Sequence, residues 1–279
     1  MTGALEYAAD MEMPRMLHIH LVRSKEVHAE ILKIDYEKAL EMPGVETVIT
    51  SEDVPGEDRF GVYYHDQPVL AKGKIRFYGE PVVAIVAETL EDAEEAEKGV
   101  EITYKKLPVV SNIQEAIECK AVLHEDHPDN IVSTTCVQKG NVEEGFKSSE
   151  IIIEKDFSTQ AVDHAYLETE AGISYCDPDG TIVVKSCDQD ITHHRVLLAK
   201  ILGMPINKVR VIMSPVGGGF GGKEDMIYQA ILAIATLKTN QPVKLVFSRE
   251  DSMIGSCKRH PVTMHYKIGL KSGWKDSGG

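Results

Sequence analysis

Five glycines and a lysine gather in the stretch Val216-Gly-Gly-Gly-Phe-Gly-Gly-Lys-Glu-Asp225, which has the composition most suited to binding chemistry. Glycine has no side chain to pack and loses much backbone entropy on ordering, so this run cannot be the interior of a helix or strand. The β-branched residues 208–214 predict a strand before it, and the apolar residues 224–237 predict a buried helix after it. That order aims free N–H groups and the positive end of a helix dipole at one point, which predicts an anion-binding site.

Two nucleotide-binding motifs fit this glycine loop imperfectly. The spacing Gly-x-Gly-x-x-Gly over residues 217–222 fits the dinucleotide fingerprint, and Gly-x-x-x-x-Gly-Lys over residues 217–223 fits most of the phosphate loop of NTPases. The NTPase loop needs a hydroxyl next, but the chain has Glu224, whose charge would face the phosphates. The dinucleotide motif needs an acidic residue about 20 positions on, where residues 238–242 offer none. A nucleotide-binding module and a glycine turn without a ligand both remain open.

A second candidate is Ser186-Cys-Asp-Gln189, at the end of a predicted hairpin strand upstream of the loop. The sequence has no Gly-x-Ser-x-Gly and no His-Glu-x-x-His pattern. The histidines and acids of residues 124–130 lie in a polar stretch and are expected to be solvated, and His193-His194 are expected at a helix cap or on the surface. Five cysteines without a Cys-x-x-Cys pair favour free structural thiols in a reducing compartment.

The charge of the whole chain limits its partners. The formal net charge is −14 over 279 residues and no basic run occurs, which argues against nucleic acid and anionic membranes as partners. The first ten residues lack the charged and apolar regions of an export signal, and the longest apolar stretch, residues 226–237, is too short to span a bilayer. A cytoplasmic protein is expected.

The pattern of apolar and polar residues along the sequence predicts an α+β chain in two parts. The first part has expected strands at 16–22, 29–35, 46–50, 81–87 and 101–106 and helices at 36–40 and 89–98. The apolar strand 81–87 is expected to be covered on both faces, and with the helix capped by Thr89 and the strand 101–106 it predicts a βαβ unit. The second part has expected strands at 150–156, 173–176, 181–185, 208–214, 243–247 and 263–268 and a helix at 196–202.

Four stretches in this order resemble the molybdenum-binding subunit of the xanthine dehydrogenase and aldehyde oxidase family. They are His28-Ala-Glu-Ile31 through Ser51-Glu-Asp-Val-Pro-Gly56, Phe77-Tyr-Gly-Glu-Pro-Val82, His164-Ala-Tyr-Leu-Glu168, and Gln189 through the glycine loop to Lys258-Arg-His-Pro261. The resemblance implies an α/β hammerhead domain at residues 1–112, a linker at 113–149, and the N-terminal part of a truncated molybdopterin-binding α+β domain at 150–279.

The same resemblance implies the site residues. Gln189 falls where the family's glutamine hydrogen-bonds an oxygen ligand of molybdenum, and Gly218, Gly219, Phe220, Gly221 and Gly222 fall where the loop backbone approaches the molybdenum-pterin cofactor. The pterin holds the metal, so no protein side chain is expected to ligate it. Glu224 falls where purine-oxidising members keep a carboxylate for the heterocycle. An amide at Gln189 could orient the centre without adding charge, and a buried carboxyl at Glu224 could have a raised pKa.

The implied function is oxidative hydroxylation of an N-heterocycle such as a purine, or of an aldehyde, with water as the oxygen source. Electrons would pass to [2Fe-2S] and FAD carriers on partner subunits. Family members continue for several hundred residues beyond the Arg-His-Pro stretch, and that part carries the catalytic base and most pterin contacts. The chain is therefore expected to be inactive alone, either as a split subunit or as a truncated product, and a non-catalytic assembly subunit remains an alternative.

Overall fold

The computed structural model describes residues 3–271, which divide into two compact units. The first unit comprises residues 3–108 together with 163–257, and the second comprises 109–162 together with 258–271. The first unit therefore draws on both predicted regions of the sequence, and the predicted domain boundaries at 112 and 149 remain a prediction.

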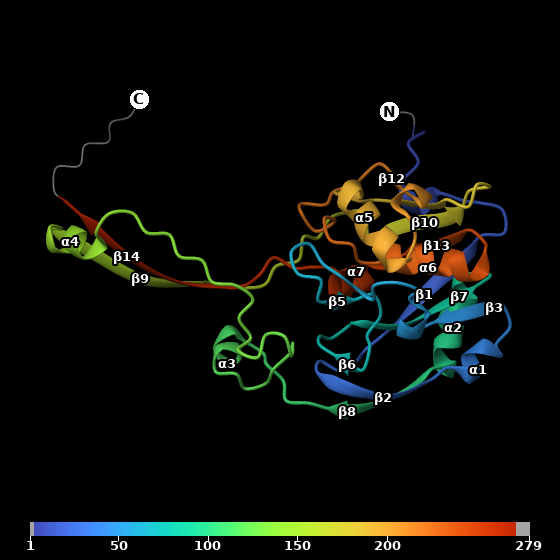
Figure 1. The fold of residues 1–279 in the computed structure, drawn as a ribbon, viewed down its shortest axis with the longest axis horizontal. Helices are drawn as coiled ribbons and strands as arrows, with labels where there is room; N and C mark the ends of the chain where they lie inside the picture. The colour runs from blue at the N-terminus through green and yellow to red at the C-terminus, as the bar shows by residue number, and fades with distance from the viewer. Residues whose placement is uncertain (1–2, 272–279) are drawn as a thin grey trace. The chain divides into compact units, whose positions relative to one another are not determined.

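A seven-stranded mixed sheet is the scaffold of the first unit (Figure 1). Its strands, in spatial order, are β12 (Val209–Met213), β11 (Ile182–Ser186), β10 (Ala171–Cys176), β13 (Val243–Val246), β1 (Leu17–Arg23), β7 (Pro81–Ala87) and β3 (Val45–Ile49). The two halves of the sheet meet where β1 pairs in parallel with β13. A hairpin joins β10 and β11 as predicted, with its turn closed by Gly180, which has a positive φ of 79°.

Two smaller sheets complete the strands of this unit. One contains β6 (Lys74–Ile75), β2 (Ala29–Asp35) and β8 (Glu101–Lys106), and the other pairs β4 (Arg59–Phe60) with β5 (Gln67–Pro68). The predicted βαβ unit is wrong, because β7 lies in the main sheet whereas β8 pairs antiparallel with β2 in the three-stranded sheet. Periodicity located both strands, but it carries no information on which partner each one pairs with.

Helices cover the main sheet and form the core with it. They are α1 (Glu37–Leu40), α2 (Leu90–Ala96), α5 (Ile191–Ile201), α6 (Gln229–Thr239) and α7 (Arg249–Gly255), with short 3-10 turns at Ala8–Asp10, Ser51–Asp53, Glu97–Gly99 and Ile206–Lys208. Helix α6 packs on β10, β11 and β13, and its first eight residues are all buried. Alternate residues of β7 pack into two different hydrophobic clusters, which confirms that both of its faces are covered.

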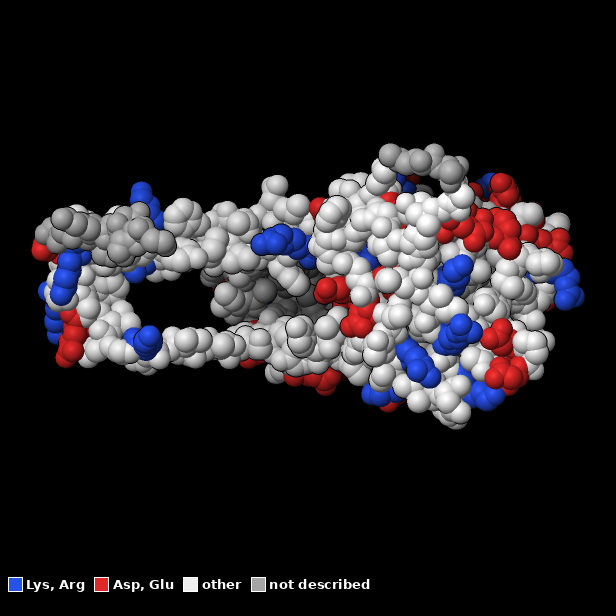
Figure 2. Space-filling view, turned by 90° about the horizontal axis from the view of Figure 1, so that it is seen from above, with Lys and Arg blue, Asp and Glu red and all other residues white. Residues whose placement is uncertain are grey.

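The second unit contains a long antiparallel ribbon and two short helices. Strand β9 (Ile151–Thr159) pairs with β14 (Val262–Leu270) over nine residue pairs, and the helices are α3 (Ile113–Ile117) and α4 (Val142–Lys147). No helix in residues 3–271 is long and apolar enough to cross a membrane. On the face shown in Figure 2, lysines and arginines are scattered among Asp and Glu residues rather than gathered in a basic stripe.

Candidate functional site

The two candidate stretches lie together because they leave neighbouring strands of the main sheet. Strands β11 and β12 are parallel, so their carboxyl ends lie at the same edge, and Gln189 follows β11 while the glycine loop follows β12. Asp190 fixes the start of helix α5, because its side chain caps the helix by accepting from the His193 amide at 3.0 Å.

Gln189 is bound to the glycine loop through both its backbone and its side chain. Its amide donates to the Lys223 carbonyl at 2.9 Å, and its Oε1 accepts from the amides of Gly221 at 3.2 Å and Lys223 at 3.1 Å. Because both neighbours are donors, the side-chain amide must present its oxygen to the loop. Its Nε2 group is thereby left as a donor for a ligand.

The backbone of the loop takes conformations that favour glycine, and at Gly219 and Gly222 it leaves no room for a Cβ atom. Gly218 and Gly221 have φ angles of 95° and 91°, and Phe220 has a φ of 54° with 74% of its surface exposed. A Cβ on Gly219 would lie 2.4 Å from Gln189 Oε1, and a Cβ on Gly222 would lie 2.7 Å from His164 Nδ1. A bulky aromatic held at positive φ is a strained position, and such positions cluster at functional sites.

The loop also offers unsatisfied polar groups. None of the described residues accepts a hydrogen bond from the amides of Gly218, Gly219 or Phe220. The buried Nδ1 atom of His164 likewise has no hydrogen-bond partner in the described part of the chain. Consecutive free amides in a strained turn form a concavity suited to an anion. The loop backbone therefore supplies free donors of the kind that the predicted anion site requires.

The helix dipole does not contribute as the sequence predicted. Helix α6 begins only at Gln229, because the Gln229 side chain accepts from the amides of Ile227 and Tyr228 and ends the irregular segment there. Glu224 is consequently not a first-turn helix acid. It lies in the irregular segment with its side chain exposed, and no described residue pairs with its carboxylate.

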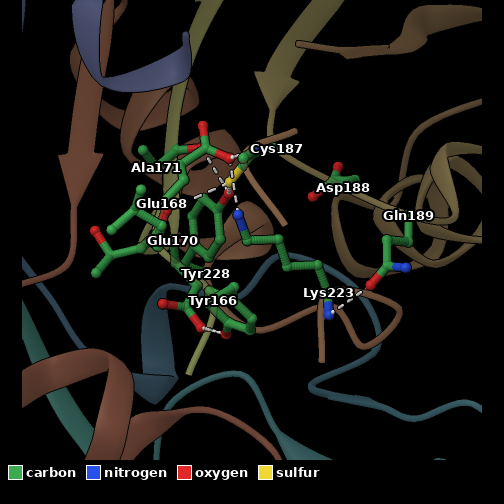
Figure 3. Close-up of polar contacts among 12 residues, drawn as sticks. Tyr166, Glu168, Glu170, Ala171, Cys187, Asp188, Gln189, Lys223 and Tyr228 are labelled. Carbon is green, nitrogen blue, oxygen red and sulfur yellow. Dashed lines mark hydrogen bonds and ion pairs between the residues drawn. The ribbon is translucent and has the colours of Figure 1, made fainter. Parts of the chain in front are cut away.

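The Lys223 side chain points into the protein, toward Glu168 (Figure 3). Its Nζ lies 2.8 Å from Glu168 Oε2, with the two side chains only 2% and 11% exposed, and 4.7 Å from the centre of the Tyr166 ring. The same Glu168 oxygen accepts from the Gly217 amide at 2.7 Å. A phosphate-binding lysine would have to face the loop, so this geometry argues against an NTPase phosphate loop.

Beneath this ion pair lies a buried polar layer that also contains Cys187 (Figure 3). Tyr166 donates to the Glu170 carboxylate, and burial together with that carboxylate raises the pKa of Tyr166. Tyr228 donates to the Ala171 carbonyl at 2.6 Å and lies 3.6 Å from Cys187 Sγ. Burial raises the pKa of the Cys187 thiol, which keeps it protonated and unreactive.

A third group of buried polar residues, which the sequence did not predict, holds the backbone of Glu224 in place. His194 donates from Nε2 to the Glu224 carbonyl at 2.8 Å, and its Nδ1 lies 3.3 Å from Asp188 Oδ2. Asp188 also accepts from Ser186 at 2.6 Å and from Gln229. Burial opposes a charge on His194, but Asp188 and the Glu224 carbonyl outweigh it and raise the pKa of His194. The expected capping or surface role is therefore wrong for His194, whose side chain is fully buried.

Within residues 3–271, no group of three His, Cys, Asp or Glu side chains could hold a metal ion. The polar atoms of the loop that lack a partner among the described residues include hydrogen-bond donors. Gln189 Nε2 and the free amides of Gly218, Gly219 and Phe220 supply these donors from adjacent segments.

Both parts of the sequence match protein families. Residues 123–275 match the molybdopterin cofactor-binding domain, and residues 2–108 match the a/b hammerhead domain of aldehyde oxidase and xanthine dehydrogenase. These matches confirm the predicted fold class of a hammerhead and a molybdopterin-binding domain.

Individual relatives cover nearly all of the chain. A probable xanthine dehydrogenase subunit from Bacillus subtilis is 38% identical over 99% of this chain and 36% of its own length. The nicotinate dehydrogenase large molybdopterin subunit from Eubacterium barkeri is 37% identical over 96% of this chain and 63% of its own length. The solved structure of an aldehyde oxidoreductase from Desulfovibrio gigas superposes with a TM-score of 0.92 at 28% identity, covering 97% of this chain and 31% of that one. The chain thus spans between about a third and two thirds of these proteins.

Proposed function

The chain belongs to the xanthine dehydrogenase and aldehyde oxidase family of molybdenum hydroxylases, and we propose that it forms one wall of a molybdenum-pterin site. The enzyme that contains this site would hydroxylate an N-heterocycle such as a purine, or an aldehyde, with water as the oxygen source. The observation that carries the proposal is the fixed Gln189 amide, whose oxygen is held by two loop amides so that Nε2 is free to donate.

The residues present fit the cofactor. A pterin with its molybdenum centre is a bulky anionic group, and the loop offers it the amides of Gly218, Gly219 and Phe220 with no Cβ at the glycines to hold it away. Gln189 would donate to the cofactor from Nε2, and the cofactor, when bound, would supply the two-electron redox chemistry. Gly221 and Gly222 would act by keeping Gln189 and His164 in place.

Glu224 is proposed to bind the substrate. Its exposed carboxylate has no partner among the described residues, whereas its backbone is held by buried His194, so the group is positioned yet available. A carboxyl there could exchange a hydrogen bond with a ring nitrogen of a heterocycle. The carboxylate of Glu168 is engaged with Lys223 and that of Asp188 with Gln229, and we assign no catalytic base to this chain.

The proposed partners are a [2Fe-2S] subunit, an FAD-binding subunit, and the polypeptide that carries the rest of the molybdenum site. Support comes from the length of the relatives, since this chain spans 36% of the Bacillus subtilis protein and 63% of the Eubacterium barkeri protein. The names of both describe them as subunits.

The experiment that tests this function is purification of the assembled complex through a tag on this chain. Molybdenum and pterin are then quantified, and oxidation of a purine, of nicotinate and of an aldehyde is measured with an artificial electron acceptor. We expect stoichiometric molybdenum and pterin and turnover of at least one of these substrates. A complex that binds ATP or NAD(H) in the loop and contains no pterin would contradict the proposal.

A further inference from the structure

The β9–β14 ribbon has two chemically different faces. Because side chains alternate along a strand, the odd-numbered residues of β9 share one face with the even-numbered residues of β14, which are their partners in the register. That face, which we call the apolar face, carries eight hydrophobic side chains among its ten positions. They are Ile151, Ile153, Phe157, Val262, Met264, Tyr266, Ile268 and Leu270.

The opposite face of the ribbon carries charged pairs. Glu154 lies 3.3 Å from Lys267, and His265 lies 2.8 Å from Asp156 and 3.1 Å from Glu154. Helix α4 lies against β14 (Figure 1). It packs on this face of the ribbon, since its residue Phe146 approaches Gly269 and lies beneath the Lys267 ammonium. The charged face is therefore both solvated and partly covered by the chain itself.

The apolar face is uncovered. Seven of its eight hydrophobic residues are between 41% and 52% exposed, including Phe157 at 52% and Ile268 at 50%. Phe157 and Tyr266 pack edge to face with ring centres 5.8 Å apart, which leaves their other surfaces open. A contiguous exposed apolar patch of this kind marks an interaction surface on soluble proteins.

We infer that the apolar face docks the remaining part of the molybdenum subunit, the part that relatives carry beyond the length this chain spans. The inference rests on the proposed function. Its support is that this chain covers 36% of the Bacillus subtilis relative and 31% of the Desulfovibrio gigas structure, so those proteins contain further polypeptide able to cover the ribbon. The docking segment must present an apolar strip of its own.

The charge at the centre of the apolar face favours the remaining part of the molybdenum subunit as the binding partner over a second copy of the chain. Lys155, opposite Tyr266, is the fifth of the nine residue pairs, so it lies in the middle of the face. A two-fold dimer packed face to face about that point would bring two Lys155 ammonium groups together in an apolar interface, which is unfavourable. The segment that docks here should instead place a carboxylate opposite Lys155.

The test is site-specific photo-crosslinking in the purified complex. A photo-crosslinking phenylalanine analogue is placed at Phe157 on the apolar face or, as a matched control, at its neighbour Ser158 on the opposite face. We expect crosslinked peptides between position 157 and the rest of the molybdenum subunit, identified by mass spectrometry, and none from position 158. Crosslinks to a second copy of this chain or to an iron–sulfur or FAD subunit, or equal yields at the two positions, would overturn the inference.

A second measurement uses charge substitutions on the same two neighbours. Phe157→Asp should lower the yield of assembled complex about tenfold, whereas Ser158→Asp should change it less than about twofold. The pterin content of the unmodified complex is measured in parallel. A complex that retains pterin but assembles equally with both variants would refute the docking surface and leave the proposed function intact. Loss of yield with Phe157→Asp in a complex that contains no pterin would refute the function instead.

Discussion

At the residue scale, the side chain of Gln189 is the central feature of the proposed cofactor site. Its carbonyl oxygen is used by the amides of Gly221 and Lys223, which fixes the amide plane and leaves one donor group for the cofactor. An outer-sphere contact of this kind orients a metal centre and tunes it without adding charge.

Gln189→Ala removes that donor and also frees the loop amides. We expect turnover of the assembled enzyme to fall about 10- to 100-fold, as for other residues that support a metal centre without ligating it. The measurement is steady-state oxidation per bound molybdenum, with Gln114→Ala on exposed helix α3 as the control, since Gln114 bonds only Glu118. Unchanged turnover in Gln189→Ala would show that the Gln189 side chain has no role in the site.

Glu224→Ala tests the substrate contact. Loss of one hydrogen bond to a charged group should lower the kcat/KM for a purine by about tenfold or more, while oxidation of an aldehyde, which has no ring nitrogen, should fall less. Glu143→Ala, at an exposed position in helix α4, is the control. If purine oxidation is unaffected by Glu224→Ala, the assignment of a heterocyclic substrate is wrong.

The raised pKa of His194 predicts that the stability of the folded protein depends on pH. Its pKa is raised in the folded protein, because Asp188, the Glu224 carbonyl and Asp190 together outweigh burial. A raised pKa means that the folded state binds the proton more tightly than the unfolded state. The stability that the protonated side chain contributes is therefore complete below about pH 6.5, its unfolded pKa, and is lost as the pH rises through the folded value.

The measurement is urea denaturation of the wild type and of His194→Gln between pH 5.5 and 9. The stability advantage of the wild type should be largest at the acidic end and shrink as the pH rises. An advantage that grows with pH would show that His194 is neutral in the folded protein.

At the scale of elements, the glycine loop that follows β12 is held in place by buried polar contacts rather than by a helix N-terminus. The Lys223–Glu168 pair joins the end of the loop to the segment before β10, and Glu168 also holds Gly217 at its start. This pair is buried, so removing one partner leaves an uncompensated charge.

Lys223→Met should destabilise the first unit by about 3–5 kcal/mol, measured by urea denaturation. Lys98→Met removes an exposed pair with Glu95, and should cost no more than about 0.5 kcal/mol. The double variant Lys223→Met, Glu168→Met should recover part of the loss because no buried charge remains. Equal stability of Lys223→Met and Lys98→Met would mean that the pair does not anchor the loop.

Local patterns in the sequence were sufficient to predict individual elements. The strands β2, β7 and β8 have the predicted bounds, and Thr89 caps α2 by accepting from the Asp92 amide at 3.1 Å. Pairing could not be predicted in this way, and β8 was assigned to the wrong partner. Periodicity reports which face of a strand is buried, whereas the partner is chosen by contacts between residues far apart in the sequence.

The site was predictable only in part for the same reason. The glycine loop and Gln189 stand out by composition and by resemblance, but nothing in the sequence indicates that the Gln189 oxygen occupies the loop amides. The supporting residues Asp188 and His194 lie close to Gln189 in the sequence, and this proximity was the only signal, because their burial is seen only in the structure. The late start of α6 depends on Gln229, whose side chain satisfies amides that a helix would otherwise use.

At the scale of the whole molecule, residues 3–108 and 163–257 both contribute strands to the seven-stranded sheet, so the loop is supported by a scaffold drawn from both matched domain families. This arrangement gives the loop a rigid base, since β11 and β12 pair in the same sheet as β1 and β7. Under the function proposed above, the face of the site opposite the loop would come from polypeptide that the relatives carry in addition to the part matched here.

The most direct test of this account is the position of molybdenum. Crystals of the complex purified through this chain, measured at the molybdenum absorption edge, should show one strong anomalous peak beside the Gln189 amide and the backbone of residues 219–221. A peak located away from that loop, or a nucleotide bound in the loop without molybdenum, would contradict the claim that this chain forms one wall of a molybdenum-pterin site.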